Sequence, residues 1–339
     1  CGRQCGRWAF AARQARKMKN VRLLALALSI AACSSAASAQ NYPAKPIRLI
    51  APFPPGGSTD LLARVVAQKL TDAWGQQVIV ENRGGAGGTI GVELAARAAP
   101  DGYTIVMGHI GTFGANPTLY PKLPYDAIKD FAPITLLAMV PNGMVVHPTL
   151  PVRSVKDLLA IARAKPGNVL YGSGGSGSAA HLAMVYFELL AKVKLTHIPY
   201  KGTGPAIYDL IAGQTSTMIT GMAALMPHIK SQKLRIIGVG TAKRLAVLPD
   251  VPTISEAGVP GYEATQWYGI LAPAATPRDI VMKLNAEMVK ALRLPDVRER
   301  LAGDGVVPVG NTPEEFSAHI KSEIARWAPV VKASGAKPE

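Results

Sequence analysis

The chain has 339 residues and a formal net charge of +15, with 37 lysines and arginines against 22 acidic residues. Its basic residues are spread along the chain without a run of five, whereas a nucleic-acid-binding protein would carry a clustered basic patch with aromatic stacking residues. The composition therefore argues against a nucleic-acid partner and suits a small anionic ligand.

The N-terminal segment, residues 1–39, has the pattern of upstream sequence followed by a secretory signal peptide. Basic residues after Met18 precede an apolar run over residues 23–32, and an Ala-Ser-Ala cleavage pattern follows at residues 37–39. The apolar run is about half of the roughly 20 residues that a membrane span requires. We therefore predict secretion to the periplasm with cleavage before Gln40. An alternative interpretation is a lipid anchor at Cys33, because the preceding residues resemble a lipoprotein box.

The predicted cleavage changes the chemistry that the chain can offer. Residues 1–39 hold all three cysteines and seven basic residues, but no acidic residue. The mature chain would have no thiol, which excludes a disulfide, a zinc–thiolate site and a cysteine nucleophile. Its net charge would be +8, from 30 basic and 22 acidic residues, and its 300 residues (339 minus 39) suffice for two domains.

The first unit of the fold runs from a predicted strand at residues 47–50 through a Pro/Gly turn into a helix. We expect Ser58 or Thr59 to cap that helix and Asp60 to lie in its first turn. The first amides of a helix have no partner within the helix, and the helix dipole adds partial positive charge there. The turn is therefore a candidate site for an anion.

A second unit repeats this pattern more than 100 residues later. A short strand at residues 169–171 enters the Gly/Ser loop 172–177, and a helix is expected to open near Ser178. Two such helix starts suggest two lobes that face one ligand. The alternative is that both loops are simply tight strand-to-helix turns, in which Gly, Ser and Asp are common.

The remaining chain alternates between predicted strands and helices, which indicates an α/β fold. Further strands are expected at residues 78–80, 104–107, 131–140, 195–199, 216–220, 234–240 and 265–273, and further helices at 89–98, 154–162, 205–211 and 227–230. Three helices are expected to close the chain, and the last begins with a capping box at residues 312–315.

Six short motifs occur in a fixed order along the chain. They are Pro-Phe-Pro-Pro-Gly-Gly-Ser-Thr-Asp at residues 52–60, Glu-Asn-Arg at 81–83, Pro-Asp-Gly-Tyr at 100–103, Tyr-Lys-Gly at 200–202, Pro-Asp-Val-Pro-Thr at 249–253 and Glu-Ala-Gly at 256–258. Each motif alone is weak, but the ordered set is specific. From about Tyr42 to its C-terminus the chain resembles the solute receptors of tripartite tricarboxylate transporters, the Bug-type periplasmic binding proteins.

The resemblance implies an α/β fold of the type II periplasmic binding protein class, with two α/β lobes joined by two crossover strands. Lobe one would comprise residues 41–139 and 266–339, and lobe two residues 140–265. Members of this family are receptors rather than enzymes, and we expect a monomer without a cofactor or metal. The implied ligand is a small organic carboxylate or an acidic amino acid, which the receptor delivers to membrane permease subunits.

The ligand-binding residues that we predict lie in the loops of both lobes, where backbone amides and hydroxyl groups bind the ligand. They are Phe53, Gly57, Ser58, Thr59, Asp60, Asn82, Thr112, Ser173, Gly174, Ser176, Gly177, Ser178, His181, Thr203 and Thr220, with His109 as a further candidate. Phe53 would form an apolar wall, while Asp60 is expected to stabilise its loop by capping. His181 is expected to brace the second loop.

One stretch departs from the family pattern. Relatives usually carry acidic residues in the strand after Gly213, at the positions of Ser216 and Thr220 in this chain. Because both acids are missing, the ligand choice of relatives does not transfer to this chain.

Other functions were weighed against the receptor hypothesis. Residues 172–177 fit the dinucleotide pattern G-x-G-x-x-G, but no acidic residue follows at the end of the next strand, where a nicotinamide enzyme would need one. The serine-hydrolase pattern fails because Ser178 stands where the last glycine belongs. The six histidines show no metal-binding spacing. A receptor that feeds a signalling partner, rather than a transporter, remains an alternative at this point.

Overall fold

The structure is a computed structural model that describes residues 42–338. The signal segment, the cleavage pattern at residues 37–39 and the alternative lipid anchor at Cys33 lie outside the described residues. The chain divides into two units after Ala44, and the fold described below is that of the unit from Lys45 onward.

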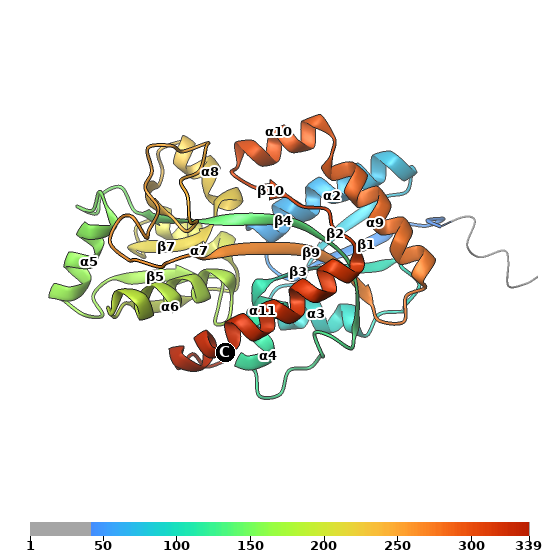
Figure 1. The fold of residues 1–339 in the computed structure, drawn as a ribbon, viewed down its shortest axis with the longest axis horizontal. Coiled ribbons are helices and arrows are strands. Elements are labelled where there is room, and N and C mark those ends of the chain that lie inside the picture. Colours follow the sequence, from blue (N-terminus) through green and yellow to red (C-terminus); the bar gives the residue numbers. More distant parts are fainter. Residues whose placement is uncertain (1–41, 339) are drawn as a thin grey trace, which may run out of the picture. The chain divides into compact units, whose positions relative to one another are not determined.

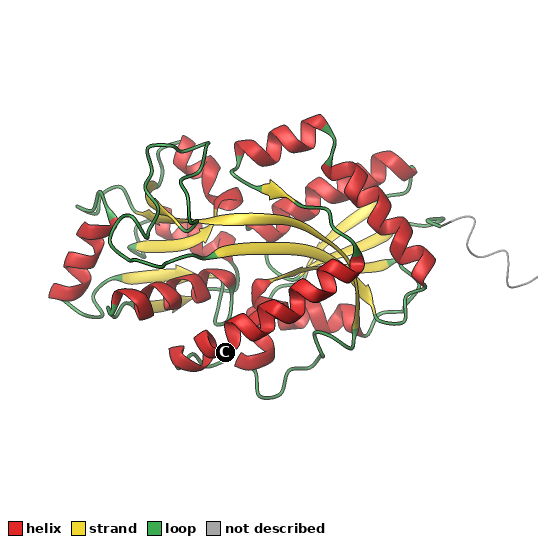
Figure 2. Ribbon diagram, in the orientation of Figure 1, coloured by secondary structure: helices red, strands yellow, loops and turns green. Residues whose placement is uncertain are grey.

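Strands and helices alternate through this unit, as the sequence predicts (Figure 2). The strands are β1 (Ile47–Ala51), β2 (Val78–Asn82), β3 (Thr104–His109), β4 (Phe131–Val146), β5 (Leu170–Ser173), β6 (Thr196–Pro199), β7 (Thr217–Gly221), β8 (Arg235–Val239), β9 (Thr265–Pro273) and β10 (Val307–Pro308). The helices are α2 (Ser58–Trp74), α3 (Thr89–Ala96), α4 (Asn116–Leu119), α5 (Val155–Ala164), α6 (Ala179–Ala191), α7 (Thr203–Ile211), α8 (Met222–Lys230), α9 (Arg278–Leu292), α10 (Pro295–Gly303) and α11 (Pro313–Ser334), with a short 3-10 turn η1 (Ala86–Gly88) and a π-helix η2 (Ile110–Ala115).

Two sets of parallel strands are joined by one antiparallel pair. Strands β2, β1 and β3 are parallel neighbours at one end of the sheet order, and β5 pairs in parallel with β6 and β7 at the other. The long strands β4 and β9 lie antiparallel between them, paired from Phe131–Pro273 to Pro141–Thr265 (Figure 1). The unit therefore has two α/β lobes joined by two crossover strands, which confirms the predicted fold class.

Each lobe has its own hydrophobic core. In the first, Phe113, Trp267 and Phe316 are fully buried together. In the second, Tyr171 and Phe187 pack in a separate cluster with the apolar face of α5. The first cluster also includes Ala179 and Leu182 of α6, so apolar packing connects the two lobes in addition to the crossover strands and the facing loops.

Local sequence signals place most helix ends correctly. Thr312 accepts a hydrogen bond from the Glu315 amide at 3.2 Å, and the Glu315 carboxylate accepts one from the Thr312 amide at 2.9 Å, so the predicted capping box is confirmed. Helix α6 begins directly after its cap at Ser178, also as predicted.

Two local predictions are wrong. The cap of α2 is Gly57 rather than Ser58 or Thr59, and Ser58 is instead the first helical residue, with no side-chain cap bond. Helix α8 begins at Met222, well before the predicted start at residue 227, because the apolar run that precedes Pro227 is buried as helix. The π-helix at residues 110–115 was not predicted from the sequence.

Candidate functional site

The loop that leads into α2 is fixed by Asp60 and Asn82. The buried Asp60 carboxylate accepts hydrogen bonds from the Gly56 amide at 3.2 Å and from the Asn82 amide group at 3.0 Å, and it pairs with Arg64 at 3.0 Å. Asn82 also donates to the Phe53 carbonyl oxygen at 2.9 Å. Asp60 and Asn82, both predicted as site residues, thus hold the loop in shape with groups that are already engaged.

The side chain of Ser58, unlike those of Asp60 and Asn82, does not bond to its own loop. It is 4% exposed, and its hydroxyl has no hydrogen-bond partner in the structure. A Cβ atom placed on Gly221, at the end of β7, would lie 2.7 Å from this hydroxyl, so Ser58 faces the opposite lobe. Thr59 follows it as a second buried hydroxyl residue in the first turn of α2. Thr220 is buried on β7 beside Gly221.

The start of α7 contacts the start of α2. Helix α7 begins at Thr203 after its cap at Gly202. A Cβ atom on Gly57 would lie 3.4 Å from the Thr203 side chain, and one on Gly204 would lie 2.3 Å from the Pro55 carbonyl oxygen. A Cβ atom on Gly174 would lie 3.0 Å from the Thr203 amide nitrogen. Gly57 and Gly174 thus both lie close to Thr203 at the start of α7.

The Gly/Ser loop before α6 is held by its own side chains. The Gly175 amide donates to the Ser173 hydroxyl at 3.1 Å, and the Gly177 amide donates to Nδ1 of His181 at 3.1 Å. Ser178 caps α6 by accepting a hydrogen bond from the His181 amide at 3.3 Å. His181 therefore braces the loop, as predicted. Because the Gly177 amide is already bonded to His181, Gly177 shapes the loop and does not offer its amide to a ligand.

On the lobe-one side, His109 and Thr112 form a second capping pair. The Thr112 amide donates to Nδ1 of His109 at 3.0 Å, and the Thr112 hydroxyl accepts a hydrogen bond from the His109 amide at 3.2 Å. The Phe53 ring packs against His109 with centroids 4.8 Å apart and the ring planes tilted by 37°. Burial lowers the pKa of His109 to about 4, so this imidazole is neutral at pH 7. A Cβ atom on Gly111 would lie 2.7 Å from the carbonyl oxygen of Gly177 in the Gly/Ser loop.

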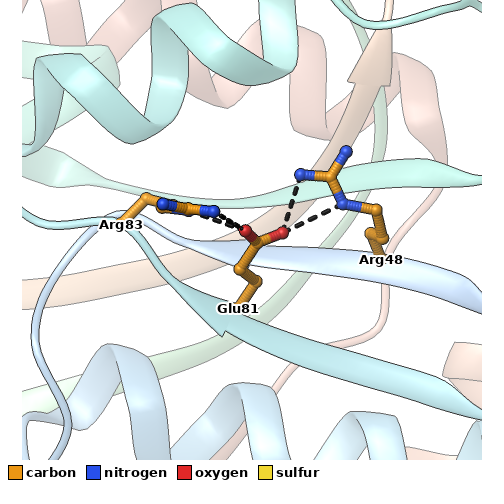
Figure 3. A network of polar contacts seen from close by, with 3 residues as sticks. All are labelled: Arg48, Glu81 and Arg83. Carbon is orange, nitrogen blue, oxygen red and sulfur yellow. Dashed lines mark hydrogen bonds and ion pairs between the residues drawn. The ribbon is translucent and has the colours of Figure 1, made fainter.

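Three charged side chains near the loop before α2 are paired with one another. Glu81 lies between Arg48 and Arg83, and its carboxylate binds both guanidinium groups (Figure 3). The hydrogen bond from Arg48 holds the pKa of Glu81 below its usual range. Arg83, at the end of the Glu-Asn-Arg motif, is therefore engaged by Glu81 rather than presented to a ligand.

The helix starts supply partial positive charge where these loops meet. The long helices α2 and α6 and the nine-residue α7 begin at loops that contact one another, and each helix start carries partial positive charge. Such an arrangement suits a small anion that bridges the lobes. Within residues 42–338, no group of histidine and acidic side chains is arranged to hold a metal ion.

Several residues of this contact were not predicted. Pro54, Pro55, Gly202 and Gly204 form the closest approach between the loops, and His197 supports the Gly/Ser loop from β6. The sequence places Pro54 and Gly202 in recurrent motifs, but it gives no indication that they touch, because 148 positions (202 minus 54) separate them.

The fold and the facing loops are those of a two-lobed solute-binding protein. The chain belongs to the tripartite tricarboxylate transporter family of receptors, whose family model matches residues 62–336. This is a family of periplasmic solute-binding receptors, not of enzymes. In the part of the chain that the structure describes, the helices are too short or too polar to cross a bilayer.

Curated relatives and solved structures agree with this assignment. The chain is 40% identical to protein BugT of Bordetella pertussis, over 94% of this chain and 99% of BugT. It is 38% identical to the R. palustris protein Rpa4515, solved with adipate, with a TM-score of 0.85 over 88% of this chain and all of that one. It is 35% identical to MatC from Rhodopseudomonas palustris, solved with bound malate, with a TM-score of 0.82 over 86% of this chain and all of MatC.

Proposed function

We propose that this protein captures a small organic carboxylate between its lobes and delivers it to a membrane permease of the tripartite tricarboxylate type. One observation carries the proposal: the starts of α2 and α7 and the loop before α6 meet across the cleft, and the nearby acidic side chains are already paired. Relatives solved with adipate and malate support the ligand class.

The proposed division of labour follows the contacts. Lobe one would comprise residues 41–139 and 266–339, and lobe two residues 140–265, with β4 and β9 as the hinge. Direct ligand contacts are assigned to an apolar ring, to backbone groups of the facing loops and to nearby hydroxyl groups. These residues are Phe53, Gly57, Ser58, Thr59, Gly174, Ser176, Thr203 and Thr220. A bracing role is assigned to Asp60, Asn82, Thr112, Ser173, Gly177, Ser178 and His181, whose polar groups or loop positions hold the backbone in place.

The ligand is further proposed to lack an ammonium group. An acidic amino acid would present a positive charge to the cleft, and burying a charge without a partner is costly. Asp60 and Glu81, the acidic residues beside the lobe-one loops, are already bound to arginines. Thr220 supplies a hydroxyl where relatives usually have an acid. A dicarboxylate such as malate should therefore bind more tightly than aspartate.

Two further elements of the proposal concern the cell. The N-terminal pattern supports secretion with cleavage before Gln40, which would place the mature receptor in the periplasm without a lipid anchor. The protein would act as a monomer, with the permease as its partner.

The test is a thermal-shift and calorimetric screen of the mature chain from Gln40. Malate, succinate and adipate are compared with aspartate, citrate and nicotinamide cofactors. A ligand at 100 times its dissociation constant should add about 2.7 kcal/mol of stability. Binding of a dicarboxylate supports the proposal, and tighter binding of aspartate than of malate contradicts the ammonium argument. Stabilisation by cofactors alone would overturn the receptor function.

A further inference from the structure

A column of three aromatic rings lies beneath the Gly/Ser loop. The imidazole of His181 on α6 stacks on that of His197 on β6, with centroids 4.2 Å apart and planes tilted by 16°. Tyr171 on β5 stacks on His197, with centroids 4.9 Å apart. The column links three elements of lobe two directly under the loop that faces lobe one.

Each histidine holds the loop through one polar contact: His181 bonds to the Gly177 amide, and His197 contacts the Ser173 hydroxyl. Nδ1 of His181 accepts the hydrogen bond from the Gly177 amide at 3.1 Å, so this nitrogen must carry no proton. Nε2 of His197 lies 2.6 Å from the Ser173 hydroxyl, and that hydroxyl accepts the Gly175 amide at 3.1 Å. Gly175 and Gly177 both have positive φ angles, 104° and 79°, so these two contacts fix the sharpest bends of the loop.

We propose that His197 and His181 act as a neutral positioning pair that sets the geometry of the ligand-binding loop, so that protonation of His181, whose Nδ1 accepts the Gly177 amide, weakens ligand binding. This inference rests on the proposed function, since it concerns the same cleft. His197 acts through Ser173 and His181 through Gly177, and neither imidazole needs to touch the ligand.

The surroundings of the pair keep it neutral. Burial, and secondarily the neighbouring His197, lowers the pKa of His181 to about 3, and burial lowers that of His197 to about 4. The titratable group on the far face of His197 is Tyr171, and behind it stands Glu188 of α6, whose charge is offset in part by Lys194. Burial raises the pKa of both Tyr171 and Glu188, so neither group supplies a strong negative charge that would draw a proton onto the histidines.

The pH dependence has a definite sign. Both pKa values lie below the ordinary value for histidine, so the loop is intact at neutral pH, and the hydrogen bond from the Gly177 amide to His181 is lost only as pH falls toward 3. Affinity for a carboxylate should therefore be constant from pH 8 to pH 6 and fall in acid. Because the ligand also takes up protons in acid, the comparison must be made against a variant that lacks the titrating ring.

The decisive experiment uses the chain with malate and adipate as probes, in four forms: wild type, His181→Asn, His197→Gln and His197→Phe. Asparagine and glutamine keep a side-chain hydrogen bond near the same position but do not titrate. Phenylalanine keeps the stacking and removes the hydrogen bond to Ser173. At pH 7.5 we expect His197→Phe to bind about fivefold more weakly than wild type, as the loss of one hydrogen bond predicts, with binding largely restored in His197→Gln.

Two readouts separate positioning from mere folding. Between pH 5 and pH 3, wild-type affinity should fall more steeply than that of His181→Asn, because the pKa of His181 is about 3. In the ligand-free chain, the ring protons of His181 and His197, assigned by their absence from the variants, should titrate well below pH 6 in nuclear magnetic resonance spectra. Wild-type affinity and pH profile in all three variants, or titration of both rings near pH 6.5, would overturn the inference.

The proposed function fails separately from the inference. If wild type binds neither probe but the rings still titrate low, the ligand class is wrong and the histidine pair stands as a loop-positioning device. If wild type binds and the variants bind identically, the receptor function stands and the positioning role is rejected.

Discussion

Substitution of Gly204 by alanine tests whether the loops of the two lobes must close tightly on the ligand. Gly204 is the second residue of α7, and its new Cβ atom would lie 2.3 Å from the Pro55 carbonyl oxygen. Both are backbone-fixed positions, so no side-chain rotation relieves the overlap. Gly202 has a similar constraint, because its Cβ would lie 2.5 Å from Cδ of Pro54. Closure of the mutant must leave the loops further apart.

The expected magnitude follows from overpacking and helix propensity. Forcing an extra methyl group into a packed contact costs about 1–3 kcal/mol. Because every 1.4 kcal/mol changes affinity about tenfold, the dissociation constant should rise by roughly 5-fold to 150-fold. The proposed function implies an open empty receptor in which these loops are apart and the clash is absent, and alanine stabilises a helix by up to about 1 kcal/mol relative to glycine. The empty mutant should therefore melt at the wild-type temperature or above it.

The assay is isothermal titration calorimetry with malate or adipate, combined with thermal melting of the empty chain. Gly303→Ala is the matched control, since a Cβ there meets no atom within 4 Å. Wild-type affinity for the Gly204→Ala receptor would refute closure through this contact. If the empty mutant melts at a lower temperature, and the corresponding loss of unfolding free energy equals its loss of binding free energy, the substitution damages the fold instead.

Three further predictions address the site and the fold separately. Ser58→Ala should weaken ligand binding about 2-fold to 10-fold in calorimetry. The free energy of unfolding in urea should stay unchanged or rise slightly, because the buried Ser58 hydroxyl lacks a partner in the empty protein. Unaltered affinity would exclude Ser58 from the site. Thr312→Ala should lower the free energy of unfolding by about 0.5–2 kcal/mol through loss of the cap at Glu315, with ligand affinity unchanged, and a weaker ligand affinity would contradict a purely structural role. Burial lowers the pKa of His109 to about 4 and that of His181 to about 3, so below pH 6.5 the unfolded chain binds protons that the folded chain does not. The free energy of unfolding should therefore fall with decreasing pH. The slope is up to about 1.4 kcal/mol per pH unit for each histidine between pH 6.5 and pH 4. Urea titrations at pH 7.5, 6 and 5 check this, and equal stabilities would show that both rings protonate freely in the folded state.

Local signals in the sequence determined the elements of the fold. Alternating apolar runs gave the strand and helix order, and the capping residues Ser178 and Thr312 marked two helix starts correctly. These features depend on neighbours within about four positions, so they are visible in the chain itself. The ordered motifs then gave the family and, with it, the two-lobed class.

The same local signals were insufficient where tertiary packing set a helix boundary or the role of a side chain. Apolar residues 222–226 carry no start signal, yet burial makes them the first turns of α8. The cap of α2 fell on Gly57, because the tight turn places the extended residue one position before Ser58. Asn82 looks like a ligand contact in the sequence, but its side-chain amide donates hydrogen bonds to the Asp60 carboxylate and the Phe53 carbonyl oxygen.

The sequence by itself determined the class of elements, the family and the loops that carry the candidate site. Only the tertiary structure decided which groups in those loops are already engaged and which residues meet. The contact of Pro55 with Gly204 and the stacking of His181 on His197 join positions distant in the chain. Such contacts depend on how the strands are ordered and how the lobes face each other, and a pattern of neighbouring residues does not encode that geometry.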